Sequence, residues 1–284
     1  MNMINLLLQP FEFEFMINAF LISIAISIPA SILSCYLILK GWSLMGDAIS
    51  HAVLPGIVVA YIINIPLIIG AFIAGLLCTF FTGFISDNSR VKQDTVMGVV
   101  FSGMFAVGIV IYTKIDSNLH LDHILFGNML GINKQDLIIT SIITTLISIV
   151  IFIKWKDLLV FCFDPIQSKA LGLNIKYLHY GLLILLSLTI VTILKAVGII
   201  LAISLLITPG AIAFLITKKF SHMLLYSIII STASTLSGVY MSFYIDSAPA
   251  PTIVLVMTIV FIITFIISSF KKTYNPEYNN IKNN

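Results

Sequence analysis

The chain has 284 residues, of which 59% are hydrophobic and 10% are charged, and its mean hydropathy is +1.10. Soluble globular domains carry about 25% charged residues, so this composition excludes a soluble fold and predicts an integral membrane protein. The net charge is only +3 and the basic residues form short clusters between apolar runs, a pattern that sets membrane topology and does not indicate a nucleic-acid partner.

Apolar stretches follow one another along the whole chain. The run from Ala48 to Ser86 contains no Asp, Glu, Lys or Arg, which is too long for one span of about 20 residues, and Asn64-Ile65-Pro66 favours a turn in its middle. The sequence predicts an all-α polytopic membrane helix bundle that forms one domain, residues 1–284, with a polar tail at 271–284. Nine spans are predicted, near residues 15–39, 44–63, 66–86, 95–113, 137–153, 177–194, 196–217, 221–245 and 250–270.

Basic residues predict the orientation of these spans. With the N-terminus outside, twelve Lys and Arg residues fall inside and three fall outside, as expected for loops that obey the positive-inside rule. This places the C-terminus in the cytoplasm. Because Lys195 leaves almost no loop between the sixth and seventh spans, that region could be re-entrant or broken, and eight full spans is an open alternative.

One aspartate and one histidine, Asp47 and His51, enter the apolar second span. Their i, i+4 spacing puts both side chains on one helix face. A carboxylate in hydrocarbon is costly unless it is paired, solvated or bound to a cation, and imidazole is a good transition-metal ligand. We therefore predict that the pair handles a divalent metal ion. The alternative is that Asp47 caps its helix and His51 is a hydrogen-bonded packing residue.

Two donors from one helix are too few to hold a metal ion. A second copy of the helix, related by a two-fold axis, would supply two more and give about four oxygen and nitrogen ligands. Such a site suits manganese(II), iron(II) or zinc(II), and mixed carboxylate and imidazole ligation does not choose among these metals.

Two connections between predicted spans are longer than the others. The inner one, residues 154–176, is predicted to contain a short helix with Asp164 as N-cap, Pro165 as its first residue and Gly172 as its C-terminal stop. This helix is either a docking site for a partner protein or an amphipathic connector without a partner. The outer one, residues 114–136, could collect cations at an entrance or be a solvated surface. Its candidate entrance residues are Asp116, His120, Asp122 and His123.

Several chemistries are not supported by any motif. The sequence has no G-x-x-x-x-G-K-[ST], so we expect no ATP site of the usual kind, and it has neither H-E-x-x-H nor G-x-S-x-G. Cys35, Cys78 and Cys162 are far apart and are expected to be buried free thiols. His179 and His222 lie near predicted cytoplasmic span ends and are expected to be interfacial rather than ligating.

The segment Gly41-Trp-Ser-Leu-Met-Gly-Asp-Ala-Ile-Ser-His-Ala-Val-Leu-Pro-Gly56 resembles the signature of the permease subunit of manganese, zinc and iron ABC importers. The resemblance covers nearly the whole chain. His123 to Asn128 resembles the outer-loop motif of that family. Leu206 to Ala211 resembles its Thr-Pro motif, although the family often has alanine where Gly210 stands. Residues 163–174 resemble its ATPase-coupling segment, with Asp164, Pro165, Lys169, Ala170, Leu171 and Gly172 as the candidate coupling residues.

The resemblance implies a homodimeric permease in the bacterial plasma membrane, surrounded by lipid, with no permanently bound cofactor. It implies a separate ATP-binding subunit, an extracytoplasmic metal-binding protein that delivers the ion, and coordination of the ion in transit by Asp47 and His51. The wording of the signature is closest to the manganese and iron branch. The relation of this family to cobalamin-type (type II) importers implies a pathway at the dimer interface.

Two other functions remain open at this point. A secondary transporter driven by protons, working alone, would be served equally well by an aspartate and a histidine within the membrane. An intramembrane enzyme would need a nucleophile and base pair, and none stands out within a span.

Overall fold

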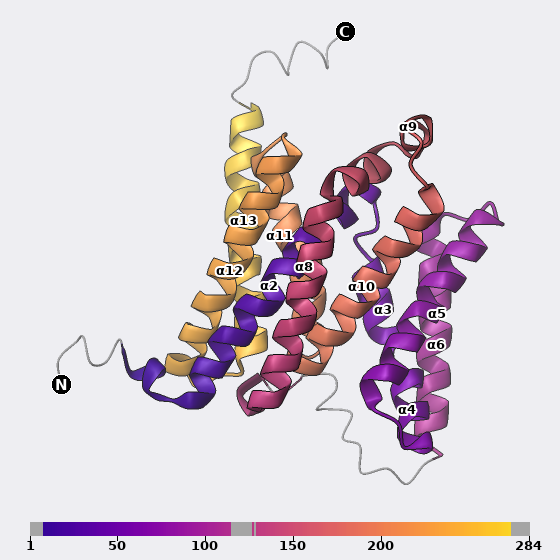
Figure 1. The fold of residues 1–284 in the computed structure, drawn as a ribbon. Helices are drawn as coiled ribbons and strands as arrows, with labels where there is room; N and C mark the ends of the chain where they lie inside the picture. Colours follow the sequence, from indigo (N-terminus) through magenta and orange to yellow (C-terminus); the bar gives the residue numbers. More distant parts are fainter. Residues whose placement is uncertain (1–7, 115–126, 128, 274–284) are drawn as a thin grey trace.

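The structure is a computed structural model that describes residues 8–114, 127 and 129–273. Within those ranges it is almost entirely helical and contains no strand (Figure 1). The helices are η1 (Gln9–Glu12), α2 (Glu14–Lys40), α3 (Met45–Ala52), α4 (Leu54–Ile63), α5 (Leu67–Asp87), α6 (Gln93–Tyr112), η2 (Met129–Gly131), α8 (Lys134–Phe163), α9 (Pro165–Ala170), α10 (Ile175–Val197), α11 (Ile199–Ile216), α12 (Phe220–Ile245) and α13 (Pro249–Thr273).

The nine-span prediction is confirmed. In the part of the chain that the structure describes, nine helical segments are long and apolar enough to cross a membrane, counting α3 and α4 together as the second. Successive segments alternate in direction, so the start of α2 and the end of α13 lie at opposite ends of the bundle (Figure 1). The short helix α9 lies at the same end as the end of α13.

The break between the sixth and seventh spans lies at Gly198 and not at Lys195. Helix α10 continues through Lys195 to Val197, and Gly198 has φ +85° and ψ 178°, a backbone conformation that is accessible mainly to glycine. Helix α11 begins at the next residue. The chain therefore turns on a single glycine, and both segments are full spans, which settles the count within the described residues at nine rather than eight.

The second predicted span is two helices rather than one. Helix α3 ends at Ala52 and helix α4 begins at Leu54, with Pro55 in the first turn of α4. Proline has no N–H to donate to the carbonyl of His51, four residues earlier, and its ring crowds the preceding turn. The interruption places the end of α3, and with it His51, at a break in the helix.

Helix α2 is the central element of one half of the bundle and packs against α8, α11 and α12. Ser34 shows how polar groups are satisfied there. Its hydroxyl donates to the carbonyl of Ile207 at 3.1 Å and accepts from the N–H of Gly210 at 3.0 Å, on either side of Pro209 in α11. Neighbouring side chains of this kind make a proline tolerable within a membrane helix.

The opposite edges of the bundle are the least buried. Helices α4, α5 and α6 pack on one another at one edge, and α13 lies at the other, against α11 and α12 (Figure 1). In the most apolar window of each, only 17% of α6 and 11% of α13 is buried within the chain. Both helices therefore present most of their surface to lipid or to another protein.

Candidate metal-binding site

Helix α3 carries the two candidate ligands. The chain leaves α2 at Gly41, buries Trp42, and enters α3 with Leu44 at the N-cap position and no side-chain capping bond. Asp47 is in the first turn of α3 but does not cap it. The alternative in which Asp47 is a helix cap is therefore wrong, and its carboxylate is available for another interaction.

Asp47 and His51 face one another along α3. Nε2 of His51 lies 3.4 Å from Oδ1 of Asp47, and the side chains are 30% exposed for His51 and 34% for Asp47. One turn of helix brings the carboxylate and the imidazole together, as the i, i+4 spacing predicts. Both groups remain partly open, so a cation could reach them without unfolding the helix.

The opposite sides of α3 are packed. Gly46, Ala48, Ile49 and Ala52 are buried, and a Cβ on Gly46 would lie 3.2 Å from Cδ1 of Leu206 in α11. The His51 side faces α6, where its ring lies 5.4 Å from that of Phe105 and 6.1 Å from that of Phe101, between ring centroids. Asp47 and His51 therefore lie on a helix that is packed on one side and contacts aromatic rings of α6 on the other.

The pair is incomplete as a closed metal site. Among the residues that the structure describes, no group of three or more His, Cys, Asp or Glu side chains could hold a metal ion. One chain offers two donors, whereas a closed tetrahedral site takes four. A closed site would therefore need ligands beyond this pair.

Helix α9 has the capping geometry that the sequence predicts. Oδ1 of Asp164 accepts from the N–H groups of Ile166 at 2.8 Å and Gln167 at 3.2 Å, Pro165 is the first helical residue, and Gly172 has φ +76° just beyond the end. Of the other predicted coupling residues, Lys169, Ala170 and Leu171 are exposed.

Two large apolar side chains of the predicted coupling segment are exposed. Phe163 is 77% exposed and Ile166 is 83% exposed, at the end of the bundle that carries α9. Both lie in the predicted coupling segment, but their exposure could not be read from the sequence, because apolar residues next to a membrane span are usually buried or in lipid. Large apolar side chains that project from a rigid, capped helix are typical of a contact with another protein.

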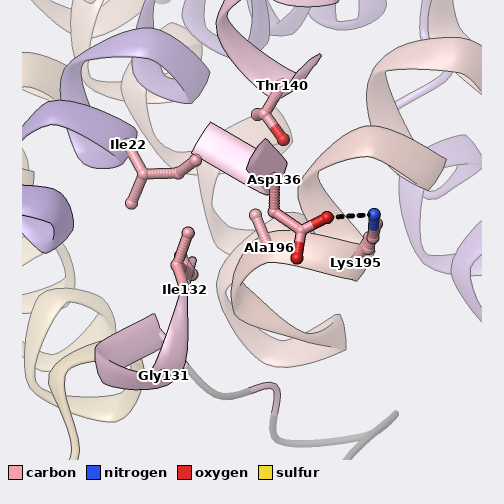
Figure 2. Close-up of a pocket in the computed structure, with 7 residues that line it drawn as sticks. All are labelled: Ile22, Gly131, Ile132, Asp136, Thr140, Lys195 and Ala196. Atoms are coloured by element: carbon pink, nitrogen blue, oxygen red, sulfur yellow. Dashed lines mark hydrogen bonds and ion pairs between the residues drawn. The ribbon is translucent and has the colours of Figure 1, made fainter. Parts of the chain in front are cut away.

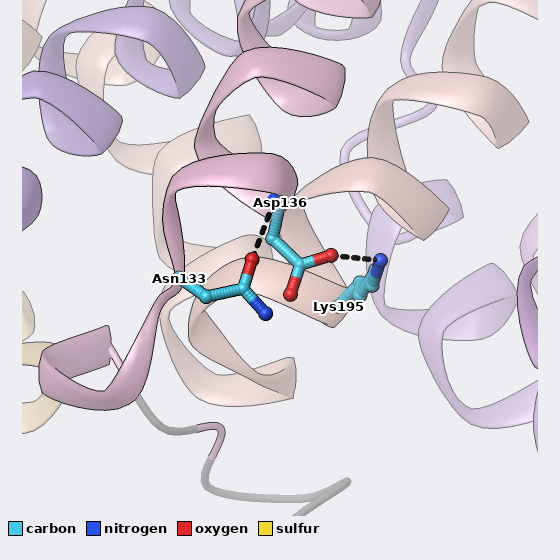
Figure 3. A network of polar contacts seen from close by, with 3 residues as sticks. All are labelled: Asn133, Asp136 and Lys195. Atoms are coloured by element: carbon cyan, nitrogen blue, oxygen red, sulfur yellow. Dashed lines mark hydrogen bonds and ion pairs between the residues drawn. The ribbon is translucent and has the colours of Figure 1, made fainter.

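The candidate entrance residues Asp116, His120, Asp122 and His123 lie outside the described residues, and their role stays a prediction. The structure also shows an ion pair between α8 and α10 that the sequence did not predict. Nζ of Lys195, in the last turn of α10, lies 2.5 Å from Oδ1 of Asp136, whose N–H donates to the cap residue Asn133 (Figure 3).

This ion pair lines a hollow of about 280 Å³ (Figure 2). Ile22 of α2, Ile132 and Thr140 also line it, so the hollow lies where α2, α8 and α10 meet. The ion pair joins the last turn of α10 to the first turn of α8, next to the turn at Gly198.

The three cysteines are buried free thiols, as expected, whereas the interfacial position of His179 and His222 stays a prediction. The ring of His179 packs against Trp42 at 5.4 Å between centroids, and His222 is exposed at the start of α12. All three cysteines are buried and free of disulfide bonds, so they are packing residues in this structure.

The sequence matches the ABC 3 transport family over residues 12–268. The chain belongs to the ABC 3 transport family. Family membership identifies it as a membrane-spanning transport component of an ABC system, which favours this function over a secondary transporter that works alone.

Similar family members have names that refer to iron or manganese. The chain is 52% identical to the chelated iron transport system membrane protein YfeD of Yersinia pestis over 262 residues, 92% of this chain and 88% of that protein. It is 49% identical to the manganese transport system membrane protein MntB of a Synechocystis species over 255 residues, 90% of this chain and 83% of that protein.

A solved family structure shows the same fold. A chain of PsaBC from Streptococcus pneumoniae, determined in complex with a Fab, is 35% identical, with a TM-score of 0.83 and 99% of both chains covered. The family match, the named relatives and this structure agree with the resemblance found in the segment from Gly41 to Gly56. The chain is a multi-pass membrane protein of this family, whose members are transport permease subunits of ABC transporters.

Proposed function

We propose that the chain is the permease subunit of an importer for manganese(II) or iron(II), and that Asp47 and His51 bind the ion in transit. The single observation that carries this proposal is the pair itself, an open carboxylate and imidazole 3.4 Å apart within a membrane-spanning segment. Ionisable groups in such positions mark ion pathways. Oxygen and nitrogen donors suit manganese and iron, and relatives are named for transport of both. Zinc(II) has the same ligand preference and is the third candidate.

A second copy of the chain completes the site in this proposal. Helix α6, which packs beside His51, exposes a stripe of small and β-branched residues on its outer side, and Val99 is 68% exposed. Small residues allow membrane helices to approach closely. A two-fold axis next to α6 would bring two copies of Asp47 and His51 to one conduit, with four donors. The stripe consists of Val99, Ser102, Gly103, Ala106, Val107 and Val110.

The capped helix α9 is the proposed contact with an ATP-binding subunit. It is short, it is fixed by Asp164, and it joins α8 to α10, which packs against α3. A displacement of α9 would therefore reach the site through one intervening helix. The end of the bundle that bears α9 also carries the majority of the Lys and Arg residues, so it faces the cytoplasm by the positive-inside rule, with the N-terminus outside. An extracytoplasmic metal-binding protein would deliver the ion to the opposite end.

Reconstitution tests the function. Proteoliposomes that contain the permease and its ATP-binding subunit are expected to take up radioactive manganese or iron only when ATP and the metal-binding protein are present. Permease alone is expected to give no uptake under a proton gradient. The measurement is metal retained by the vesicles. Uptake by the permease alone, driven by protons and independent of ATP, would show that the chain is a secondary transporter.

The exposed apolar side chains of the coupling segment give a second test. The double variant Phe163→Ser, Ile166→Ser is expected to weaken binding of the ATP-binding subunit at least about tenfold, because each of the two apolar contacts is expected to contribute more than about 1 kcal/mol. Binding is measured by co-purification and titration in detergent. His222→Ala, an exposed change at the same end of the bundle, is the control and should bind normally. Equal binding by all three proteins would exclude this segment as the contact.

A further inference from the structure

A second hollow, which no residue of α3 lines, lies between α8 and α10, next to the end that carries α9. Its volume is about 510 Å³. Its floor consists of the buried side chains of Leu158, Leu178 and Leu182, and its lining is mostly apolar. Gly181 leaves the centre open, since a Cβ at that position would meet no atom within 4 Å. The hollow is thus a groove that runs along two membrane helices with an apolar base.

Two lysines, Lys154 of α8 and Lys176 of α10, line the groove. Lys154 lies 3.1 Å from Asp157, but both side chains are open to solvent, and an exposed pair of this kind is weak and easily exchanged. Lys176 makes no ion pair with the residues that the structure describes. Two lysines and one aspartate, Asp157, therefore leave the groove with a net positive charge.

The depth of these lysines matches the surface of a bilayer. Lys154 lies about twenty residues after Lys134 on the continuous helix α8, which corresponds to about 30 Å, the thickness of the hydrocarbon core. Lys176 is in the first turn of α10, and Tyr177 and Tyr180 line the groove beside it. Tyrosines are enriched at this level of membrane proteins, where polar headgroups meet the acyl chains.

We propose that this groove binds an anionic phospholipid. The phosphate is held between Lys154 and Lys176, and one acyl chain lies over Gly181 along Val150, Ile184 and Leu185. Basic pockets between membrane helices bind anionic headgroups in this manner. The combination of cationic rim and apolar base fits a molecule with a negative end and a hydrocarbon end, and the groove opens on helix surfaces that lipid surrounds. The assignment depends on membrane insertion alone and is independent of the metal proposal.

Native mass spectrometry of the detergent-solubilised full-length protein tests this proposal. Phosphatidylglycerol and phosphatidylcholine of equal chain length are added, and the bound lipid is counted. The wild type is expected to retain phosphatidylglycerol preferentially. The double variant Lys154→Gln, Lys176→Gln should bind phosphatidylglycerol about 25-fold more weakly, since each lysine near an anionic lipid contributes about a factor of five.

Two further variants distinguish the contribution of the lysines at the rim from that of the apolar base of the groove. Gly181→Leu has room for its side chain and a higher helix propensity, so it should fold normally while it fills the groove and reduces retention of both lipids. Lys156→Gln is the matched control, because its ammonium group lies near Trp155 and outside the groove. It should bind phosphatidylglycerol as the wild type does.

Three outcomes would overturn the proposal. The wild type could retain both lipids equally, or the double lysine variant could retain phosphatidylglycerol like the control. In the third outcome, Gly181→Leu would change the oligomeric state or the binding of the ATP-binding subunit while lipid retention stays unchanged, and the groove would then be a protein contact. In all three cases metal uptake by the wild-type complex is unaffected, so the proposed function is tested separately.

Discussion

The variant Asp47→Asn, His51→Gln is expected to lose metal uptake by about 100-fold or more in proteoliposomes that contain the whole complex. Mutation of groups that only support a metal ligand costs about 10- to 100-fold in affinity or activity, and removal of two ligands should cost at least as much. The replacements are close in size to the native residues, and both side chains are partly exposed, so packing of α3 against α11 is kept. Uptake of radioactive manganese and iron is the measurement.

The controls show whether the loss is local. The variant should insert into the membrane, keep its thermal stability and bind the ATP-binding subunit as the wild type does, because α9 is remote from α3 in sequence and packs mainly on α8 and α10. Asp157→Asn, His222→Gln changes the same residue types at solvent-accessible positions away from α3 and should leave uptake intact. If the Asp47 and His51 variant transports normally, the pair does not bind the ion and the proposed pathway is wrong.

The membrane spans could be predicted because each one depends on local composition. Runs of apolar residues predict nine spans, and the spacing of Asp47 and His51 predicts a shared helix face, since 3.6 residues per turn determines it. The cap at Asp164 and the stop at Gly172 also follow from local backbone chemistry. Each of these features involves residues within a few positions of one another, and the structure has all of them.

Features that depend on distant residues could not be predicted in this way. The sequence predicts that the sixth span ends just before Lys195, because a lysine is costly in a bilayer. In the structure the helix continues past Lys195, whose ion-pair partner, Asp136, is 59 positions away in the chain. Likewise, the sequence indicates only that Pro209 is tolerable in a membrane helix. The hydroxyl group that hydrogen-bonds to the backbone on either side of Pro209 belongs to Ser34, which is 173 positions from Ile207. No local pattern identifies such partners.

The contact between α4 and α5 is another feature that no local sequence pattern predicts. It helps to hold Asp47 and His51 in position, because α4 directly follows α3. A Cβ on Gly56 would overlap the carbonyl oxygen of Gly70 and lie 2.6 Å from Cβ of Ala74. A Cβ on Gly70 would overlap the carbonyl oxygen of Gly56 and lie 2.6 Å from Cβ of Ala60. The two backbones touch, as small residues permit where membrane helices cross.

Gly56→Ala is therefore expected to destabilise the protein by about 1–3 kcal/mol, and Gly70→Ala by a similar amount, because the added methyl group meets backbone that cannot rotate away. Thermal unfolding in detergent, followed by size-exclusion chromatography, measures the loss. Since both substitutions push apart the same two helices, their effects should not add in the double variant. Uptake should fall as well, since α4 follows α3 after one residue and a displaced α4 moves His51.

Gly181→Ala is the matched control for this prediction. It makes the same chemical change in a membrane helix, but its Cβ would meet no atom within 4 Å, so it should be neutral or slightly stabilising through higher helix propensity. A difference between Gly181→Ala and Gly56→Ala isolates the helix contact from the general cost of replacing glycine. If both proteins unfold at the same temperature and transport equally, α4 and α5 do not touch at Gly56 and Gly70. The position of α3 would then depend on its contacts with α5, α6, α10 and α11 and not on the crossing of α4 and α5.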